Sequence, residues 1–166
     1  MYAHAKHKSP NSQGIIMSKI AKVLATGKTH TTASSTGHTS RGHNGSLDIA
    51  LSSPGNATPA HVFAATLPHP TAEQLFAGAW SACYTAAVGL VANDMNVVLP
   101  ADMSVDIEVD VGQTGQDYFL QARLTLRVPG LADDIARTLA HTADQICPYS
   151  KATRGNIDVD LNVLTA

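Results

Sequence analysis

Charged side chains are scarce in this 166-residue sequence. Asp, Glu, Lys and Arg together make up 14% of the residues, whereas soluble domains commonly carry about 25%. Surface buried between subunits would explain this low proportion. The formal net charge of −2 gives no electrostatic reason to expect nucleic acid or an anionic membrane as a partner.

Cysteine is rare as well, since Cys83 and Cys147 are the only two in the sequence. Two cysteines in a chain of this length do not make a disulfide-stabilised scaffold. They also lack the Cys-x-x-Cys spacing of thiol-disulfide oxidoreductases, which counts against that class of enzyme. A reducing, cytoplasmic setting is the prediction that follows.

The first residues lack the apolar segment of a secretory signal. Residues 1–16 are polar and include two lysines and two histidines, which does not fit the central region of a signal peptide. Recognisable patterning begins near Met17, which would also serve as a start. We therefore predict that residues 1–17 form a poorly ordered extension and that residues 18–166 form a single domain.

Metal-binding spacing is missing too, although the chain has eight histidines. His38 and His43 lie in one predicted loop, but neither is paired with a cysteine or acidic residue at the spacing of a zinc site. We expect no metal and no other cofactor.

The most apolar stretch of the chain predicts a long helix over residues 71–93. Thr71 and Gln74 have the spacing of a capping box at its start. No charged residue occurs from Leu75 to Ala92, so the helix is apolar or small on nearly every side and must be enclosed. Its length would span a bilayer, but its small residues and lack of basic flanks favour a buried helix at the centre of a folded domain.

Alternating apolar and polar residues predict five strands around this helix. They cover residues 18–31, 47–52, 105–111, 120–128 and 157–163, with a second helix over 131–146. The order β-β-α-β-β-α-β, with consecutive strands joined as hairpins, predicts an α+β fold with helices on one face of a largely antiparallel sheet. The hairpin of 105–111 and 120–128 would pair an acidic row with a basic row on a solvated sheet face, each pair contributing roughly 0.2 to 1 kcal/mol.

The two cysteines differ in their local surroundings. Both lie in apolar helical context, where a free cysteine is commonly a small buried hydrophobe. Cys147 precedes Pro148, which suits the first position of a new helical turn, and Lys151 adds a nearby cation that favours the thiolate. Cys83 lies in mid-helix, where burial raises the pKa of a thiol. To react near pH 7, Cys83 would need a cation delivered from elsewhere in the fold.

Three motifs stand out in the chain: EQLFA at 73–77, SAC at 81–83 and the block CPYSKATRGNI at 147–157, which is the most specific. They resemble the motifs of the organic hydroperoxide resistance (Ohr) proteins in the OsmC/Ohr superfamily. The sequence SLDI at 46–49 adds to the resemblance, which covers the chain from Ser18 to its end. It implies an OsmC-like fold, with largely antiparallel sheets packed around a long central helix, in an intertwined homodimer.

The resemblance also implies a thiol peroxidase that reduces organic hydroperoxides to alcohols. In this family the first cysteine, here Cys83, becomes a sulfenic acid, and the second, here Cys147, condenses with it to a disulfide. An apolar lining that includes Phe76 and Trp80 would suit alkyl or fatty-acyl hydroperoxides. The expected reductant is a dithiol on a lipoylated protein. The alternative is a non-catalytic OsmC-like stress protein that binds a small ligand in its apolar pocket.

The resemblance assigns Glu73 the task of holding an arginine that stabilises the peroxidatic thiolate. Glu73 and Cys83 are about 15 Å apart along one helix, so a shared site requires the chain to fold back or a second subunit to contribute. Without the motif, Glu73 is better explained as a carboxylate at the helix start that balances the helix dipole.

The arginine itself departs from the family pattern. Without gaps, its position falls on Thr36, and Arg41 lies five residues further on. The loop of Ser, Thr and Gly could shift register and deliver Arg41, or His38 or His43 could act as a pH-dependent cation. Otherwise Arg41 is a solvated loop residue.

Overall fold

The computed structural model describes residues 18–32 and 71–166 of the chain. The predicted extension at 1–17, the predicted strand at 47–52 and the loop with Thr36, His38, Arg41 and His43 lie outside the described residues. The elements in chain order are β1 (Lys22–Thr32), α1 (Ala72–Asp94), β2 (Ser104–Thr114), β3 (Asp117–Arg127), α2 (Asp133–Ile146), α3 (Pro148–Thr153) and β4 (Asp158–Leu164).

The described strands form one four-stranded sheet in the order β1-β2-β3-β4. The predicted hairpin is confirmed, because β2 and β3 pair antiparallel along their whole length, and β1 pairs antiparallel with β2. β4 lies parallel to β3, so the sheet is largely antiparallel, as predicted, with one parallel pair at its edge. Along the chain, α2 and α3 connect β3 to β4. Two parallel strands need a crossover connection of this kind. The fold is therefore α+β with a mixed sheet.

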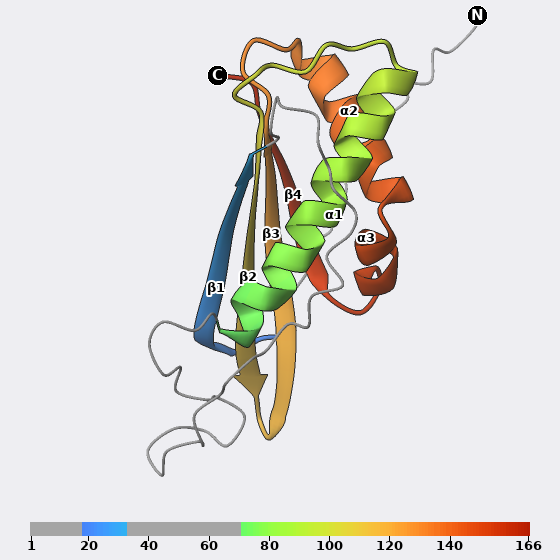
Figure 1. The fold of residues 1–166 in the computed structure, drawn as a ribbon. Helices are drawn as coiled ribbons and strands as arrows, with labels where there is room; N and C mark the ends of the chain where they lie inside the picture. The colour runs from blue at the N-terminus through green and yellow to red at the C-terminus, as the bar shows by residue number, and fades with distance from the viewer. Residues whose placement is uncertain (1–17, 33–70) are drawn as a thin grey trace, which may run out of the picture.

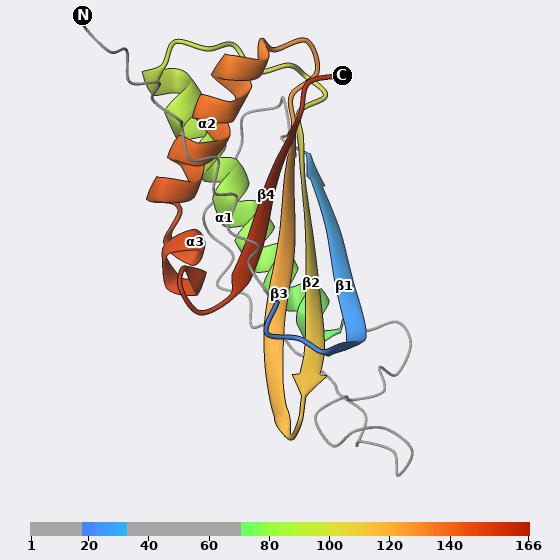
Figure 2. The ribbon, with the colours of Figure 1, turned by 180° about the vertical axis from the view of Figure 1, so that it is seen from behind.

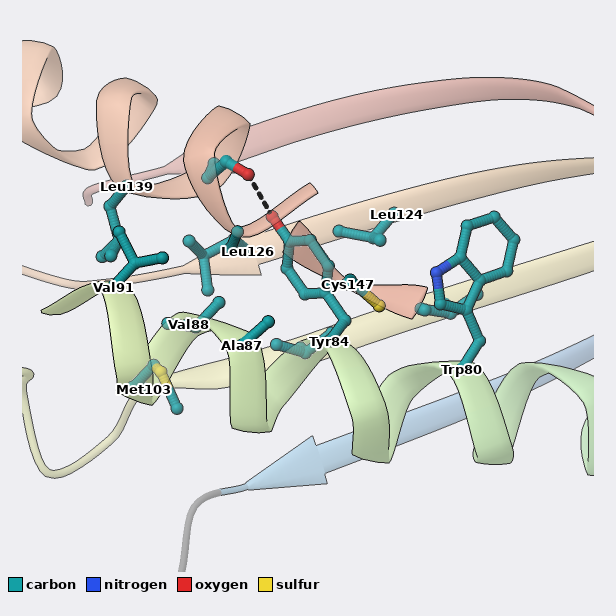
Figure 3. Packing of buried hydrophobic residues seen from close by; sticks show 14 of the residues in the cluster. Trp80, Tyr84, Ala87, Val88, Val91, Met103, Leu124, Leu126, Leu139 and Cys147 are labelled. Carbon is teal, nitrogen blue, oxygen red and sulfur yellow. Dashed lines mark hydrogen bonds between the residues drawn. The ribbon is translucent and has the colours of Figure 1, made fainter. Parts of the chain in front are cut away.

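The three helices all lie on one face of this sheet, as predicted (Figures 1 and 2). α1 runs across the sheet, and α2 and α3 lie beside it. The core between helices and sheet is shown in Figure 3. Its large, fully buried side chains are Trp80, Tyr84 and Val88 of α1, Met103 before β2, Val105, Ile107 and Val109 of β2, Leu124 and Leu126 of β3, Val128 after β3, Leu139 of α2, and Cys147.

The capping box predicted at the start of α1 is present. The amide of Gln74 donates to Thr71 Oγ1 at 3.2 Å, and the amide of Thr71 donates to Gln74 Oε1 at 3.0 Å. α1 is long and apolar enough to cross a membrane. However, 44% of its most apolar 18-residue stretch is buried inside the fold. Its packing against the sheet and α2 is that of a core helix.

One side of α1 does not meet the prediction that the helix is enclosed. Within the part of the chain that the structure describes, a stripe of small or apolar residues stays exposed on the side away from the sheet. Leu90 is the largest of them, with 64% of its surface exposed. The others are Ala79, Ala82, Ala86 and Gly89. The sheet and α2 cover only part of the helix surface, which leaves this stripe for another segment or another chain.

The outer face of the sheet carries the predicted acidic and basic rows. Asp110 is 2% exposed and accepts hydrogen bonds from Arg123 at 2.6 and 3.0 Å, from Thr26 at 2.5 Å and from Gln121 at 2.7 Å. Arg123 also pairs with Glu108 at 2.9 Å. The guanidinium of Arg123 therefore holds the pKa of the Asp110 carboxyl well below its usual range.

This buried carboxylate predicts an acid-dependent loss of stability. Because its folded pKa is depressed, its contribution is complete above the unfolded pKa of about 3.9 and is lost as the pH falls below that value. We expect Asp110→Asn to lower the free energy of unfolding at pH 7 by about 2 kcal/mol, and to flatten its decline between about pH 5 and 2 in urea titrations.

Asp106→Asn is the matched control for this prediction. Asp106 also pairs with an arginine, Arg127, and with His30, but its side chain is 23% exposed whereas that of Asp110 is 3% exposed. Water screens an exposed pair, so the control should cost less than about 1 kcal/mol. Equal losses in the two variants would show that burial of Asp110 is not what makes its pair important.

Candidate functional site

The structure brings Cys83 and Cys147 together although 64 residues separate them. Their Sγ atoms are 3.7 Å apart, and both thiols are free. Cys83 lies at the middle of α1 and is partly exposed, whereas Cys147 is fully buried. A disulfide has a sulfur-sulfur distance of about 2.05 Å, so a movement of roughly 1.7 Å would join them.

Cys147 occupies its place because Pro148 ends one helix and begins another. Proline has no amide to continue α2 and disfavours helical backbone at the preceding residue. Cys147 is accordingly extended, with φ −60° and ψ 120°, between the end of α2 and the start of α3. The prediction that Pro148 begins a new helical turn is confirmed. This break leaves the Cys147 side chain in the core, opposite α1.

The pKa of the Cys83 thiol is raised, as its position in a buried helix predicted. Burial is the main cause, and the hydrogen bond and electrostatic interaction with the Cys147 side chain raise it further. The backbone amide of Tyr149 opposes them by donating a hydrogen bond to Cys83. Although Cys83 lies in the middle of α1, far from the ends of its own helix, an amide of α3 reaches its sulfur. Among the described residues, no cation lowers the pKa of the Cys83 thiol.

Phe76 and Trp80 lie on α1 within two turns of Cys83. Their rings meet edge to face, with centroids 5.9 Å apart and planes at 80°. Trp80 is fully buried, and its Nε1 donates to Ser150 Oγ at 3.1 Å. Tyr84, next to Cys83, is also fully buried and donates to the carbonyl of Ala140 at 2.8 Å. These contacts join α1 to α2 and α3 around the two sulfurs.

Ser150 was missed by the sequence analysis. Its side chain is buried and polar, and it lies three residues after Cys147, just as Trp80 lies three residues before Cys83. This matched spacing was visible in the sequence. However, nothing in the sequence showed that α1 and α3 meet.

Glu73 lies in the first turn of α1, half-buried and ten residues before Cys83. It packs against β1, where an added Cβ at Gly27 would come within 2.6 Å of the Glu73 Cβ. Because Arg41 lies outside the described residues, its relation to Glu73 stays a prediction. No group of three or more metal-ligating side chains occurs in residues 18–32 and 71–166.

The fold and site define a class of protein: an α+β domain in which a long core helix carries one cysteine opposite a second, buried cysteine. The sequence model of the OsmC-like protein family matches residues 65–162, which include both cysteines. The chain belongs to the OsmC/Ohr family.

Individual relatives agree with this assignment. The chain is 42% identical over 91 residues to an organic hydroperoxide resistance protein of Xanthomonas axonopodis pv. citri, covering 55% of this chain and 64% of that protein. It is 35% identical to organic hydroperoxide resistance protein OhrA of Bacillus subtilis, covering 70% of this chain and 79% of that protein. A crystal structure of an organic hydroperoxide resistance protein from Elizabethkingia anophelis matches with a TM-score of 0.56 and 35% identity, covering 60% of this chain and 71% of that one. The chain thus spans slightly less than two thirds of the Xanthomonas relative.

Proposed function

We propose that the protein is a thiol-dependent peroxidase that reduces organic hydroperoxides to alcohols. The observation that carries this proposal is the 3.7 Å separation of two free thiols of unequal exposure. A partly exposed thiol can meet a peroxide, and a buried thiol at this distance can close a disulfide with it. The relatives' name, organic hydroperoxide resistance protein, agrees with this substrate class.

In the oxidative half of the reaction, Cys83 acts as the nucleophile. Its thiolate attacks the outer oxygen of the hydroperoxide, the oxygen-oxygen bond breaks, and the alkoxide takes a proton and leaves as the alcohol. Cys83 becomes a sulfenic acid. The thiolate of Cys147 then attacks the Cys83 sulfur. The sulfur-sulfur bond forms as the sulfur-oxygen bond breaks, and the hydroxide that leaves takes a proton from solvent to become water.

In the reductive half, a dithiol restores both cysteines. One of its sulfurs attacks the disulfide, the second displaces the resulting mixed disulfide, and the reductant leaves as its own disulfide. Access favours attack at Cys83, because Cys147 is fully buried. We propose a lipoyl group on a protein as the physiological dithiol.

The first step needs a cation near Cys83, because burial raises the pKa of its thiol. We propose Arg41, held by Glu73, for this role, with the amide of Tyr149 as a second source of stabilisation. A homodimer would cover the exposed stripe on α1 and would let one subunit contribute residues to the site of the other. Phe76 is the proposed apolar lining, and the fully buried Trp80 packs against it from inside the core. The cytoplasm is the proposed location.

This function predicts a preference for organic peroxides. With dihydrolipoamide as reductant, we expect kcat/KM for cumene hydroperoxide to exceed that for hydrogen peroxide by at least about tenfold. Desolvation of a phenyl group contributes roughly 2 kcal/mol, which is more than one factor of ten. The measurement is steady-state consumption of each peroxide, with glutathione as a monothiol comparison.

Two outcomes would contradict the proposal. Faster turnover of hydrogen peroxide would show that the site does not use its apolar lining for substrate binding. Turnover of neither peroxide, with both thiols reduced at the start, would favour the non-catalytic small-ligand-binding protein.

A further inference from the structure

A buried hydrogen bond joins α1 to α3 next to the cysteine pair. Trp80 Nε1 donates to Ser150 Oγ at 3.1 Å, and the two side chains are 0% and 2% exposed. Trp80 precedes Cys83 by three residues, and Ser150 follows Cys147 by three. One turn of α1 and one turn of α3 are thus joined at two points, by a hydrogen bond and by the facing sulfurs. Figure 3 shows Trp80 and Cys147 in one buried cluster.

We propose that Ser150 is a positioning residue that, through Trp80, keeps Cys147 within reach of the Cys83 sulfur. This inference rests on the proposed peroxidase function and concerns its second step, the closure of the disulfide. Ser150 touches neither the peroxide nor the reacting sulfurs in this role. It acts by holding the backbone that carries Cys147.

The short length of α3 makes this contact important. A helix of six residues has little stability of its own, so its position depends on what it packs against. The far end of α3 is held to α2, because Arg154 pairs with Asp144 at 2.8 Å. The Trp80–Ser150 hydrogen bond holds α3 to α1, the helix that carries Cys83, and so helps to set the distance between the two sulfurs.

The hydrogen bond is well placed to transmit this restraint. The indole N–H is a donor with no acceptor capacity, and a buried donor left without its partner costs about 1 to 3 kcal/mol. The bond is therefore expected to persist. In addition, the amide of Lys151 donates to the carbonyl of Cys147 at 3.0 Å, so Cys147 and Ser150 belong to one closed turn and move together.

The test separates disulfide closure from peroxide attack. In a single turnover with cumene hydroperoxide and no reductant, Ser150→Ala should consume peroxide within about twofold of the wild-type rate. Its sulfenic acid, trapped with dimedone and counted by mass spectrometry, should disappear at least about tenfold more slowly, because misplacing a reacting group by about 1 Å can cost up to a hundredfold. Ser150→Thr keeps the hydroxyl and should restore closure to within about threefold of wild type.

Thr153→Val provides the matched control. Thr153 is also a buried hydroxyl of α3, but its Oγ1 donates to the Ser150 carbonyl at 3.1 Å and not to α1. We expect its closure rate to stay within about threefold of wild type. Unchanged closure in Ser150→Ala, or equal slowing in Thr153→Val, would overturn the proposal.

A redox titration keeps the test independent of peroxidase activity. Equilibrated with a dithiol buffer, Ser150→Ala should favour the reduced thiols about tenfold more than wild type, a shift of about 30 mV in the reduction potential. Trp80→Phe removes the donor from the other side and should shift the same equilibrium in the same direction. If wild type consumes no organic peroxide, the proposed function fails. An unchanged equilibrium in both variants overturns the positioning role instead.

Discussion

Cys83→Ser is expected to abolish the reduction of organic hydroperoxides, with a fall of at least about 10³ in kcat/KM. A serine hydroxyl is not ionised at neutral pH and cannot be oxidised to a sulfenic acid, so the covalent step is lost entirely. Cys83 is the cysteine with the exposure this step needs, since Cys147 is fully buried. The measurement is peroxide consumption under steady-state conditions with a dithiol reductant.

Cys147→Ser is the matched variant and should fail in a different way. Its Cys83 is intact, so the first equivalent of peroxide should be consumed at close to the wild-type rate. No disulfide can then close, and the sulfenic acid should be trapped by dimedone or oxidised further to sulfinic acid by excess peroxide. Mass spectrometry of the two variants distinguishes these fates.

The proposal that Cys83 attacks the peroxide and Cys147 closes the disulfide would be contradicted if the two variants exchanged these results. If Cys83→Ser still consumed one equivalent of peroxide and Cys147→Ser consumed none, Cys147 would be the peroxidatic residue. The difference in burial between the two thiols would then not decide which one meets the peroxide.

Among the stability variants proposed, Gly27→Ala is expected to cause the largest loss, about 3 kcal/mol in the free energy of unfolding. Gly27 is buried in β1, opposite Val109 of β2. A Cβ at this position would meet the amide nitrogen of Gln74 and would lie 2.5 Å from the carbonyl carbon of Glu73. Both are backbone atoms of α1, so the first turn of the helix would have to move away from the sheet.

Gly78→Ala is the control at the same helix-strand contact. The nearest described atom to its added Cβ is Cγ2 of Thr29, at 3.8 Å, which is an ordinary contact. Alanine in a helix is favoured over glycine by roughly 0.5 to 1 kcal/mol, so this variant should be neutral or stabilised. Urea unfolding of both variants makes the comparison, and a cost below about 1 kcal/mol for Gly27→Ala would show that α1 does not depend on this close approach.

The Gly27 variant also bears on the proposed site. Glu73 lies in the turn that must move, and it is the residue proposed to hold Arg41. A disproportionate loss of peroxidase activity, measured at a temperature where the variant is folded, would support a role for Glu73 in the site. Activity in proportion to the folded fraction would leave Glu73 as a helix-start carboxylate only.

Local patterns in the sequence were sufficient for most of the elements. The capping box of Thr71 and Gln74, the alternation in β2 and β3 and the break at Pro148 all concern interactions within a few residues. Such interactions can be recognised without knowing the fold. The resemblance of the block at 147–157 to the Ohr motifs then led to the correct family.

The parallel placement of β4 could not be predicted in this way. Its alternating residues fit either direction, because alternation determines which side chains face the core but not the direction of the neighbouring strand. The long connection through α2 and α3 decided the matter, since it returns the chain to the sheet in the same direction as β3. The exposed stripe of α1 has a similar origin, because composition alone could not show how much of the helix surface the sheet and α2 would cover.

The sequence by itself indicated the candidate reactive groups: two thiols, one in a helix segment without charges and one before a proline. Only the tertiary structure decided how they are arranged. It set the sulfurs 3.7 Å apart, buried Cys147 more deeply than Cys83, directed the Tyr149 amide to Cys83 and joined Trp80 to Ser150. Each of these contacts spans more than sixty residues of chain. Their geometry arises when α1, α3 and the sheet bury their apolar faces together, so no short stretch of sequence contains it.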